Sequence, residues 1–241
     1  MDIVRVGTLN NFNCTKKEWD QLATFQNPNR ILFINCNAKT PGLLSINDHP
    51  YKAVITVNPD LIPNEKLIDK VLSLDPTKVA FVRVKWLPDH PDIQQVILRL
   101  RSAGLNVVIT SQRFRSHESM KKYSNPEHYA HECTWFRLHG KAWKSLLAFA
   151  KKTGALICDK KGLGCQGCHN CSTLNGGTSS DRILSLNMSS SGVCPFNCLD
   201  CYAKAIQERC TKGNPIAYNK VKANRKQKGN TQHIINNKKA A

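Results

Sequence analysis

Apolar segments of strand length alternate with amphipathic segments along most of this 241-residue chain. The expected strands cover residues 31–37, 53–58, 79–86, 105–110, 134–138, 155–158 and 183–188. Between them we expect a helix opened by Pro63, one from about Pro91 to Ala103 that Gly104 ends, and one over residues 141–152. Near-continuous apolar strands that alternate with such helices predict a parallel sheet covered by helices. We therefore expect an α/β fold with a complete or partial (β/α) barrel, and a doubly wound open sheet as the second interpretation.

The length and the apolar content of 41% allow one sizeable hydrophobic core. We expect this main domain at residues 30–210, after an N-terminal capping segment at residues 1–29 and before a basic, flexible tail at residues 211–241. Within the capping segment, Thr15 is a candidate N-cap of a short helix that carries Trp19 and Leu22 on one face. No apolar run approaches the roughly 20 residues that span a bilayer, and the first residues do not resemble a signal peptide. We expect a cytoplasmic protein without membrane partners.

Polar side chains fall at the ends of several expected strands. In parallel α/β folds ligands bind outside the carboxyl ends of the strands, so these residues are expected to share one mouth. They are Asn35, Asn37, Asn58, Lys85, Gln112, Arg113 and Arg137. Amide and cationic groups of this kind can bind an anionic or carboxylate ligand, although each residue could also serve only as a turn former, a helix cap or an exposed charge.

Three cysteines, Cys194, Cys198 and Cys201, follow the last expected strand with the spacing C-x-x-x-C-x-x-C. Three thiolates on one short loop can hold three irons of a [4Fe–4S] cluster and leave the fourth iron open to a ligand. A closed structural zinc site would need a fourth protein ligand from elsewhere. The spacing therefore favours an iron–sulfur cluster.

This cysteine triplet resembles the cluster-binding signature of radical S-adenosylmethionine (SAM) enzymes. The segment Cys201-Tyr202-Ala203 in particular resembles radical-SAM-like proteins whose triplet lies near the C-terminus. In ordinary members the triplet follows the first barrel strand, so the resemblance implies a circularly permuted barrel. Asp200 stands at a position that is usually aromatic in the family, and an electron-transfer or sensor cluster without SAM chemistry is therefore an alternative.

The resemblance implies that the open iron of the cluster takes the amino and carboxylate groups of SAM. One electron, from a donor such as flavodoxin or ferredoxin, would then cleave SAM and release a 5′-deoxyadenosyl radical that acts on an unknown substrate. Tyr202 and the strand-end residues Asn35, Lys85 and Gln112 are the residues that we expect to bind this cofactor.

A second cysteine group lies in a glycine-rich segment and consists of Cys158, Cys165, Cys168 and Cys171. Glycines let the chain fold back so that nearby thiolates converge, and four soft ligands can complete a Zn²⁺ site or a second [4Fe–4S] cluster. Alternatively, Cys194, which precedes a proline as the fourth ferredoxin ligand does, completes a cluster with residues 165–171. We favour the first allocation because it uses all seven cysteines.

The chain carries 35 Lys and Arg against 17 Asp and Glu, which gives a formal net charge of +18. Such an excess favours polyanionic partners, so we expect a nucleic-acid or nucleotide substrate. An acidic protein partner and a basic surface that only faces solvent are the alternatives. The part from Gly213 onward contains no acidic residue and little apolar material. An alternative from a different class is a non-catalytic zinc-binding protein that binds nucleic acid and in which both cysteine groups staple loops.

Overall fold

The computed structural model describes residues 2–7, 11–24, 30–62, 64–132, 135–158, 170–177, 182–186, 188–189 and 192–193. Several predicted features lie outside these residues. They are Cys165, Cys168, Cys194, Cys198, Cys201, Tyr202 and the expected tail at residues 211–241.

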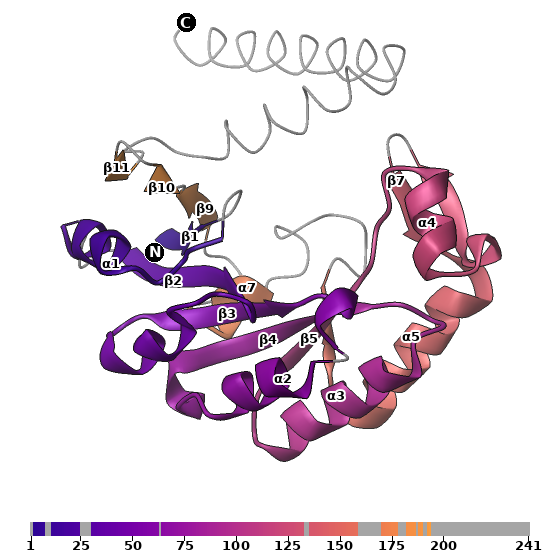
Figure 1. Ribbon diagram of the computed structural model, residues 1–241, viewed down its shortest axis with the longest axis horizontal. Helices are drawn as coiled ribbons and strands as arrows, with labels where there is room; N and C mark the ends of the chain where they lie inside the picture. The colour runs from indigo at the N-terminus through magenta and orange to yellow at the C-terminus, as the bar shows by residue number, and fades with distance from the viewer. Residues whose placement is uncertain are drawn as a thin grey trace, which may run out of the picture.

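A seven-stranded sheet forms the centre of the fold (Figure 1). The strands are β1 (Asp2–Val6), β2 (Arg30–Asn37), β3 (Lys52–Val57), β4 (Val79–Trp86), β5 (Val107–Ser111), β8 (Leu156–Ile157) and β9 (Arg182–Leu186). Their order is β8-β5-β4-β3-β2-β1-β9, and every neighbouring pair is parallel. The prediction of an α/β fold with a parallel sheet is confirmed.

The longer helices cover one face of this sheet, as Figure 1 shows for α2 (Glu65–Leu72), α3 (Pro91–Ser102) and α5 (Gly140–Thr153). Each presents buried residues to the larger hydrophobic core, among them Ile68, Ile97 and Leu146. A doubly wound sheet needs helices on both faces. From β1 to β8, each strand of the sheet also lies next to the sheet strand that precedes it in the sequence, which agrees with a partial (β/α) barrel.

The helix ends follow from local sequence. Pro91 opens α3, and Gly154 ends α5 in the left-handed conformation, with φ 67°. The short helix α1 (Lys16–Ala23) has the predicted N-cap: the Thr15 hydroxyl accepts a hydrogen bond from the Glu18 amide, and the Glu18 carboxylate accepts one from the Thr15 amide. No helix in the described ranges has the length and apolar content needed to cross a membrane.

Two predicted segments differ in the structure. The capping segment at residues 1–29 contains β1, which pairs with both β2 and β9 inside the sheet. Its apolar residues Ile3, Val4 and Val6 are buried, but Asp2 and Arg5 interrupt the run and hide it from a search for continuous apolar strands. The expected strand at residues 134–138 is also not in the main sheet: β7 (Trp135–Leu138) pairs antiparallel with β6 (Tyr129–Glu132).

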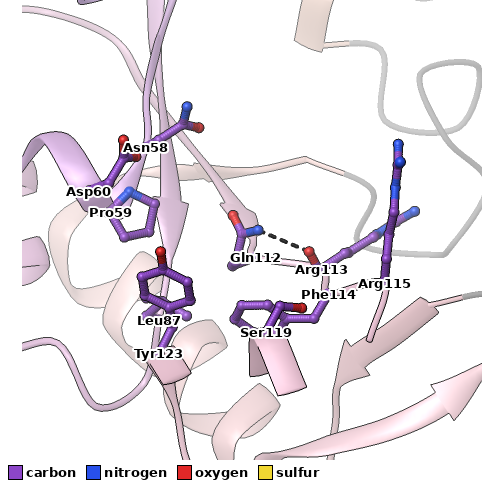
Figure 2. A pocket seen from close by; sticks show the side chains of 10 residues that line it. All are labelled: Asn58, Pro59, Asp60, Leu87, Gln112, Arg113, Phe114, Arg115, Ser119 and Tyr123. Carbon is purple, nitrogen blue, oxygen red and sulfur yellow. Dashed lines mark hydrogen bonds between the residues drawn. The ribbon is translucent and has the colours of Figure 1, made fainter. Parts of the chain in front are cut away.

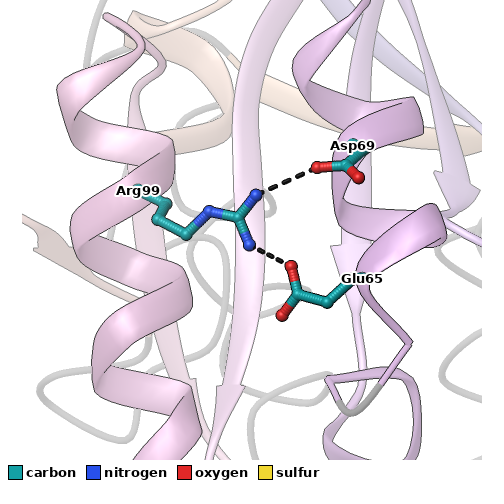
Figure 3. A network of polar contacts seen from close by, with 3 residues as sticks. All are labelled: Glu65, Asp69 and Arg99. Atoms are coloured by element: carbon teal, nitrogen blue, oxygen red, sulfur yellow. Dashed lines mark hydrogen bonds and ion pairs between the residues drawn. The ribbon is translucent and has the colours of Figure 1, made fainter.

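On the helix-covered side, Arg99 of α3 bridges Glu65 and Asp69 of α2 (Figure 3). Its Nη2 atom donates to Asp69 at 2.9 Å. All three side chains are exposed, by 40% for Arg99, 65% for Glu65 and 62% for Asp69. Water therefore screens the ion pairs.

We predict that Arg99→Met lowers the free energy of unfolding by less than about 1 kcal/mol, because exposed ion pairs contribute little. Urea denaturation at low and at high salt measures this change, and the difference between the two proteins should shrink further at high salt. A loss above about 2 kcal/mol would mean that this network holds α2 and α3 together.

Candidate functional site

The inner face of the sheet, which is the face opposite α2, α3 and α5, changes from apolar to polar along five neighbouring strands. Its apolar layer consists of Ile3, Phe33, Val54, Phe81 and Val108, all fully buried in a core cluster of their own. The residue two positions further along each strand is polar, and side chains two apart lie on the same face. These residues form the inner polar layer: Arg5, Asn35, Thr56, Arg83 and Thr110. Because the strands are parallel, this layer lies toward their carboxyl ends.

Hydrogen bonds fix the middle of the inner polar layer. Asn35 is buried, and its Nδ2 atom donates to the carbonyl of Gly7, the residue that follows β1, at 3.2 Å. Arg83 donates from Nη1 to Asn35 Oδ1 at 3.2 Å, and its guanidinium carbon lies 5.6 Å from the centroid of the Phe81 ring. The predicted strand-end residue Asn35 therefore joins the end of β1 to β4 and holds Arg83 in place.

Lys85 lies two residues beyond Arg83, at the carboxyl end of β4, and is half-buried. Burial, and then the positive charges of Arg83 and Arg113, lower the pKa of Lys85 to about 8, while Cys158 acts in the opposite direction. The predicted residues Lys85 and Cys158 are thus close enough to interact electrostatically. The mouth of the sheet has a positive potential at this point.

A cavity of about 450 Å³ opens beside this mouth, where β3, β4 and β5 end (Figure 2). Its walls come from the turns after these strands and from α4 (His117–Tyr123). It is lined by Asn58, Pro59, Asp60, Leu87, Gln112, Arg113, Phe114, Arg115, Ser119 and Tyr123. The predicted residues Asn58, Gln112 and Arg113 meet here, with Gln112 Nε2 donating to the carbonyl of Arg113 at 2.9 Å. Arg137 was also expected at this mouth but belongs to β7 of the separate hairpin.

The second cysteine group begins at the carboxyl end of β8. Cys158 packs against the inner apolar cluster, and its amide donates to the carbonyl of Ile109 of β5 at 2.8 Å. The side chain of Asn170 donates to the carbonyl of Ile157 at 3.2 Å, which brings the short helix α7 (Asn170–Thr173) to the same place. The two ends of the segment from Cys158 to Cys171 therefore meet at β8. No set of three or more potential metal ligands occurs among the described side chains.

The chain reaches the first cysteine group through β9. This strand is parallel to β1 and ends at Leu186, next to Val6. The small pair β10 (Met188–Ser189) and β11 (Gly192–Val193) follows, and Cys194 comes directly after β11 in the sequence. The cysteine triplet therefore follows a strand of the sheet in the sequence, after that strand's carboxyl end.

Arg5 and Arg83 were not predicted, because the strand that carries Arg5 was not predicted and Arg83 lies in the middle of its strand rather than at its end. The spacing of two residues between Arg83 and Lys85, in an otherwise apolar strand, is the signal that places both on one face. The exposed aromatic residue of the cavity, Tyr123, was not predicted, because residues 115–133 are mostly polar and carry no clear apolar period.

No known protein-family model matches the chain, and no curated protein is significantly similar to it. The candidate site is therefore interpreted from the fold and from its own residues.

Proposed function

We propose that the chain is a radical-SAM-type iron–sulfur enzyme built on a circularly permuted partial (β/α) barrel. The observation that carries this proposal is the position of β9, which precedes the cysteine triplet and pairs with β1. Reading the sheet from β9 gives the order β9-β1-β2-β3-β4-β5-β8. From β1 to β8, the strands lie side by side in the order in which they occur in the sequence, and only β9 comes from the far end of the chain. A triplet after β9 then corresponds to a triplet after the first barrel strand.

The charge of the inner face supports the same proposal. A cluster held by thiolates is anionic, and SAM presents a carboxylate, so both suit a mouth that contains Arg5, Arg83 and Lys85. The apolar layer beneath these residues closes the sheet interior to water. In this proposal Cys194, Cys198 and Cys201 hold a [4Fe–4S] cluster, and Tyr202, Asn35, Lys85 and Gln112 contribute to SAM binding.

A [4Fe–4S] cluster held by Cys194, Cys198 and Cys201 would supply the electron for the reductive cleavage of SAM, and a donor such as flavodoxin or ferredoxin would provide that electron. Asn35 keeps Arg83 oriented on the inner face, where its guanidinium can bind a carboxylate. Cys158, whose thiol lies near Lys85, would hold a second [4Fe–4S] cluster or Zn²⁺ with Cys165, Cys168 and Cys171.

The test is the iron, zinc and acid-labile sulfide content of protein purified without oxygen, together with its visible spectrum. We expect the Cys194/Cys198/Cys201→Ala variant to lose about four irons per chain. Cys210→Ala is the matched control, because it removes a cysteine that follows the triplet in the sequence but belongs to neither group, and it should keep the full iron content. Addition of SAM to the reduced wild-type protein should then yield methionine and 5′-deoxyadenosine.

Zinc without sulfide would overturn this proposal and point to a zinc-binding protein. Iron and sulfide without SAM cleavage would instead point to an electron-transfer or sensor cluster.

A further inference from the structure

The cavity at the ends of β3, β4 and β5 is lined by three kinds of side chains: aromatic rings, amides and cations. Tyr123 and Phe114 supply aromatic rings, Asn58 and Gln112 supply side-chain amides, and Arg113 with its neighbour Arg115 supplies cations. Its volume of about 450 Å³ lies within the range of small-ligand sites. These are the groups that bind the base and the phosphate of a nucleotide.

The aromatic part can stack a base. Tyr123 is 45% exposed although it is a large apolar ring. It lies parallel to Phe114, with ring centroids 6.3 Å apart and an interplanar angle of 9°. Figure 2 shows Pro59 on the wall next to Tyr123. Lys122 Nζ lies 5.4 Å from the centroid of the Tyr123 ring. Lys122 is exposed, so its side chain can move aside and let the ring stack any base, because every base has a π face.

The polar part provides recognition and charge. The amide of Asn58 can both donate and accept hydrogen bonds at a base edge. Arg113 and Arg115 can bind phosphate oxygens with paired donors. The one carboxylate of the lining, Asp60, accepts a hydrogen bond from Lys39 Nζ at 3.0 Å, so its negative charge is compensated.

The α4 wall of the cavity is held in place before any ligand binds. Asp89, in the turn after β4, accepts hydrogen bonds from the Ser124 hydroxyl at 2.6 Å and from the Asn125 amide at 2.9 Å. Its carboxylate also lies 3.2 Å from His128 Nδ1. The segment that presents Tyr123 is thereby fixed to the main sheet, which reduces the cost of ordering it on binding.

We propose that this cavity binds one nucleotide of a single-stranded nucleic acid, with the base against Tyr123 and the phosphates toward Arg113 and Arg115. This inference names the substrate class of the proposed enzyme and to that extent rests on the proposed function. Its binding test is independent, because it needs no iron and no SAM. A duplex would not fit this mode, since its bases are already paired and stacked.

The test uses the full chain as purified and a fluorescein-labelled single-stranded RNA of ten nucleotides, with anisotropy recorded at several salt concentrations. Tyr123→Ala should weaken binding by about tenfold or more, and Tyr123→Phe should bind like the wild type, because stacking needs only the ring. Arg113→Gln/Arg115→Gln should also weaken binding and flatten the salt dependence by about 1.4 logarithmic units per decade, as expected for two lost phosphate contacts. Circular dichroism of each variant checks that it is folded.

The matched control is Lys66→Gln/Lys144→Gln, which removes two exposed charges away from the cavity. Equal losses in this control and in the arginine variant would overturn the proposal, since binding would then follow net charge alone. It would also be overturned if deletion of residues 220–241 abolished binding while the cavity variants bound normally, or if duplex RNA bound as tightly. Competition by adenosine monophosphate would support the same site and show that a free nucleotide enters it.

Discussion

Phe81→Ala should lower the free energy of unfolding by about 3–5 kcal/mol, the range for aromatic truncation in a packed core. Phe81 is fully buried in the apolar layer of the inner face, which contains few other large side chains. Neighbouring strands cannot collapse into the space it leaves, because their backbone hydrogen bonds fix their spacing. The variant would also remove the ring over which Arg83 lies.

Urea denaturation of the metal-free protein measures this change. The matched control is Leu98→Ala on α3, because Leu98 is 49% exposed and its truncation should cost well under 1 kcal/mol, or about the scatter of surface substitutions. Equal decreases in the free energy of unfolding of both variants would mean that the inner apolar layer is not a packed core. That result would contradict the partial barrel.

The sequence predicted the elements whose signal is local. The period of apolar residues indicated α2, α3 and α5, and the run from Val79 to Trp86 indicated β4, because a strand buried on both faces is apolar at almost every position. The N-cap Thr15 was found for the same reason: capping depends on residues three apart.

The features that depend on distant pairing were not predicted. The sequence around Asp2–Val6 does not predict that this strand lies between β2 and β9, because β9 comes more than 170 positions later in the chain. Nor does the sequence around Trp135 distinguish a strand of the main sheet from one of a hairpin, since both are short and half-apolar.

The rule that ligands gather at the carboxyl ends of parallel strands led us to expect Asn35, Lys85 and Gln112 at one edge of the sheet, and they lie toward the carboxyl ends of β2, β4 and β5. The rule could not predict which other residues these side chains interact with. Asn35 holds Arg83, the pKa of Lys85 responds to Cys158, and Gln112 lines the cavity with Tyr123. Each of these pairs joins segments that the chain brings together only by folding.

The low pKa of Lys85 indicates that the fold tolerates an unfavourable charge at the mouth. In the unfolded chain this ammonium should titrate near its ordinary value of 10.5, whereas in the folded protein burial and the charges of Arg83 and Arg113 lower the pKa to about 8. Below pH 8 both states carry the proton, and the folded state bears the full cost of the charge. Between pH 8 and 10.5 the folded state releases the proton first, so the stability of the wild-type protein should rise with pH in this window.

Lys85→Met should therefore raise the free energy of unfolding of the metal-free protein at pH 7, on the order of 2 kcal/mol, and the gain should vanish by about pH 10.5. Urea denaturation from pH 7 to pH 10.5 measures both effects. Lys144→Met is the matched control, because Lys144 is exposed and its removal should leave stability nearly unchanged at every pH. A protein that keeps a destabilising cation usually does so for a function, because such strain is tolerated where a site needs it. If the gain in stability comes with weaker binding of SAM, Lys85 belongs to the site, whereas a loss of stability at pH 7 would show that its charge has a favourable partner in the folded state.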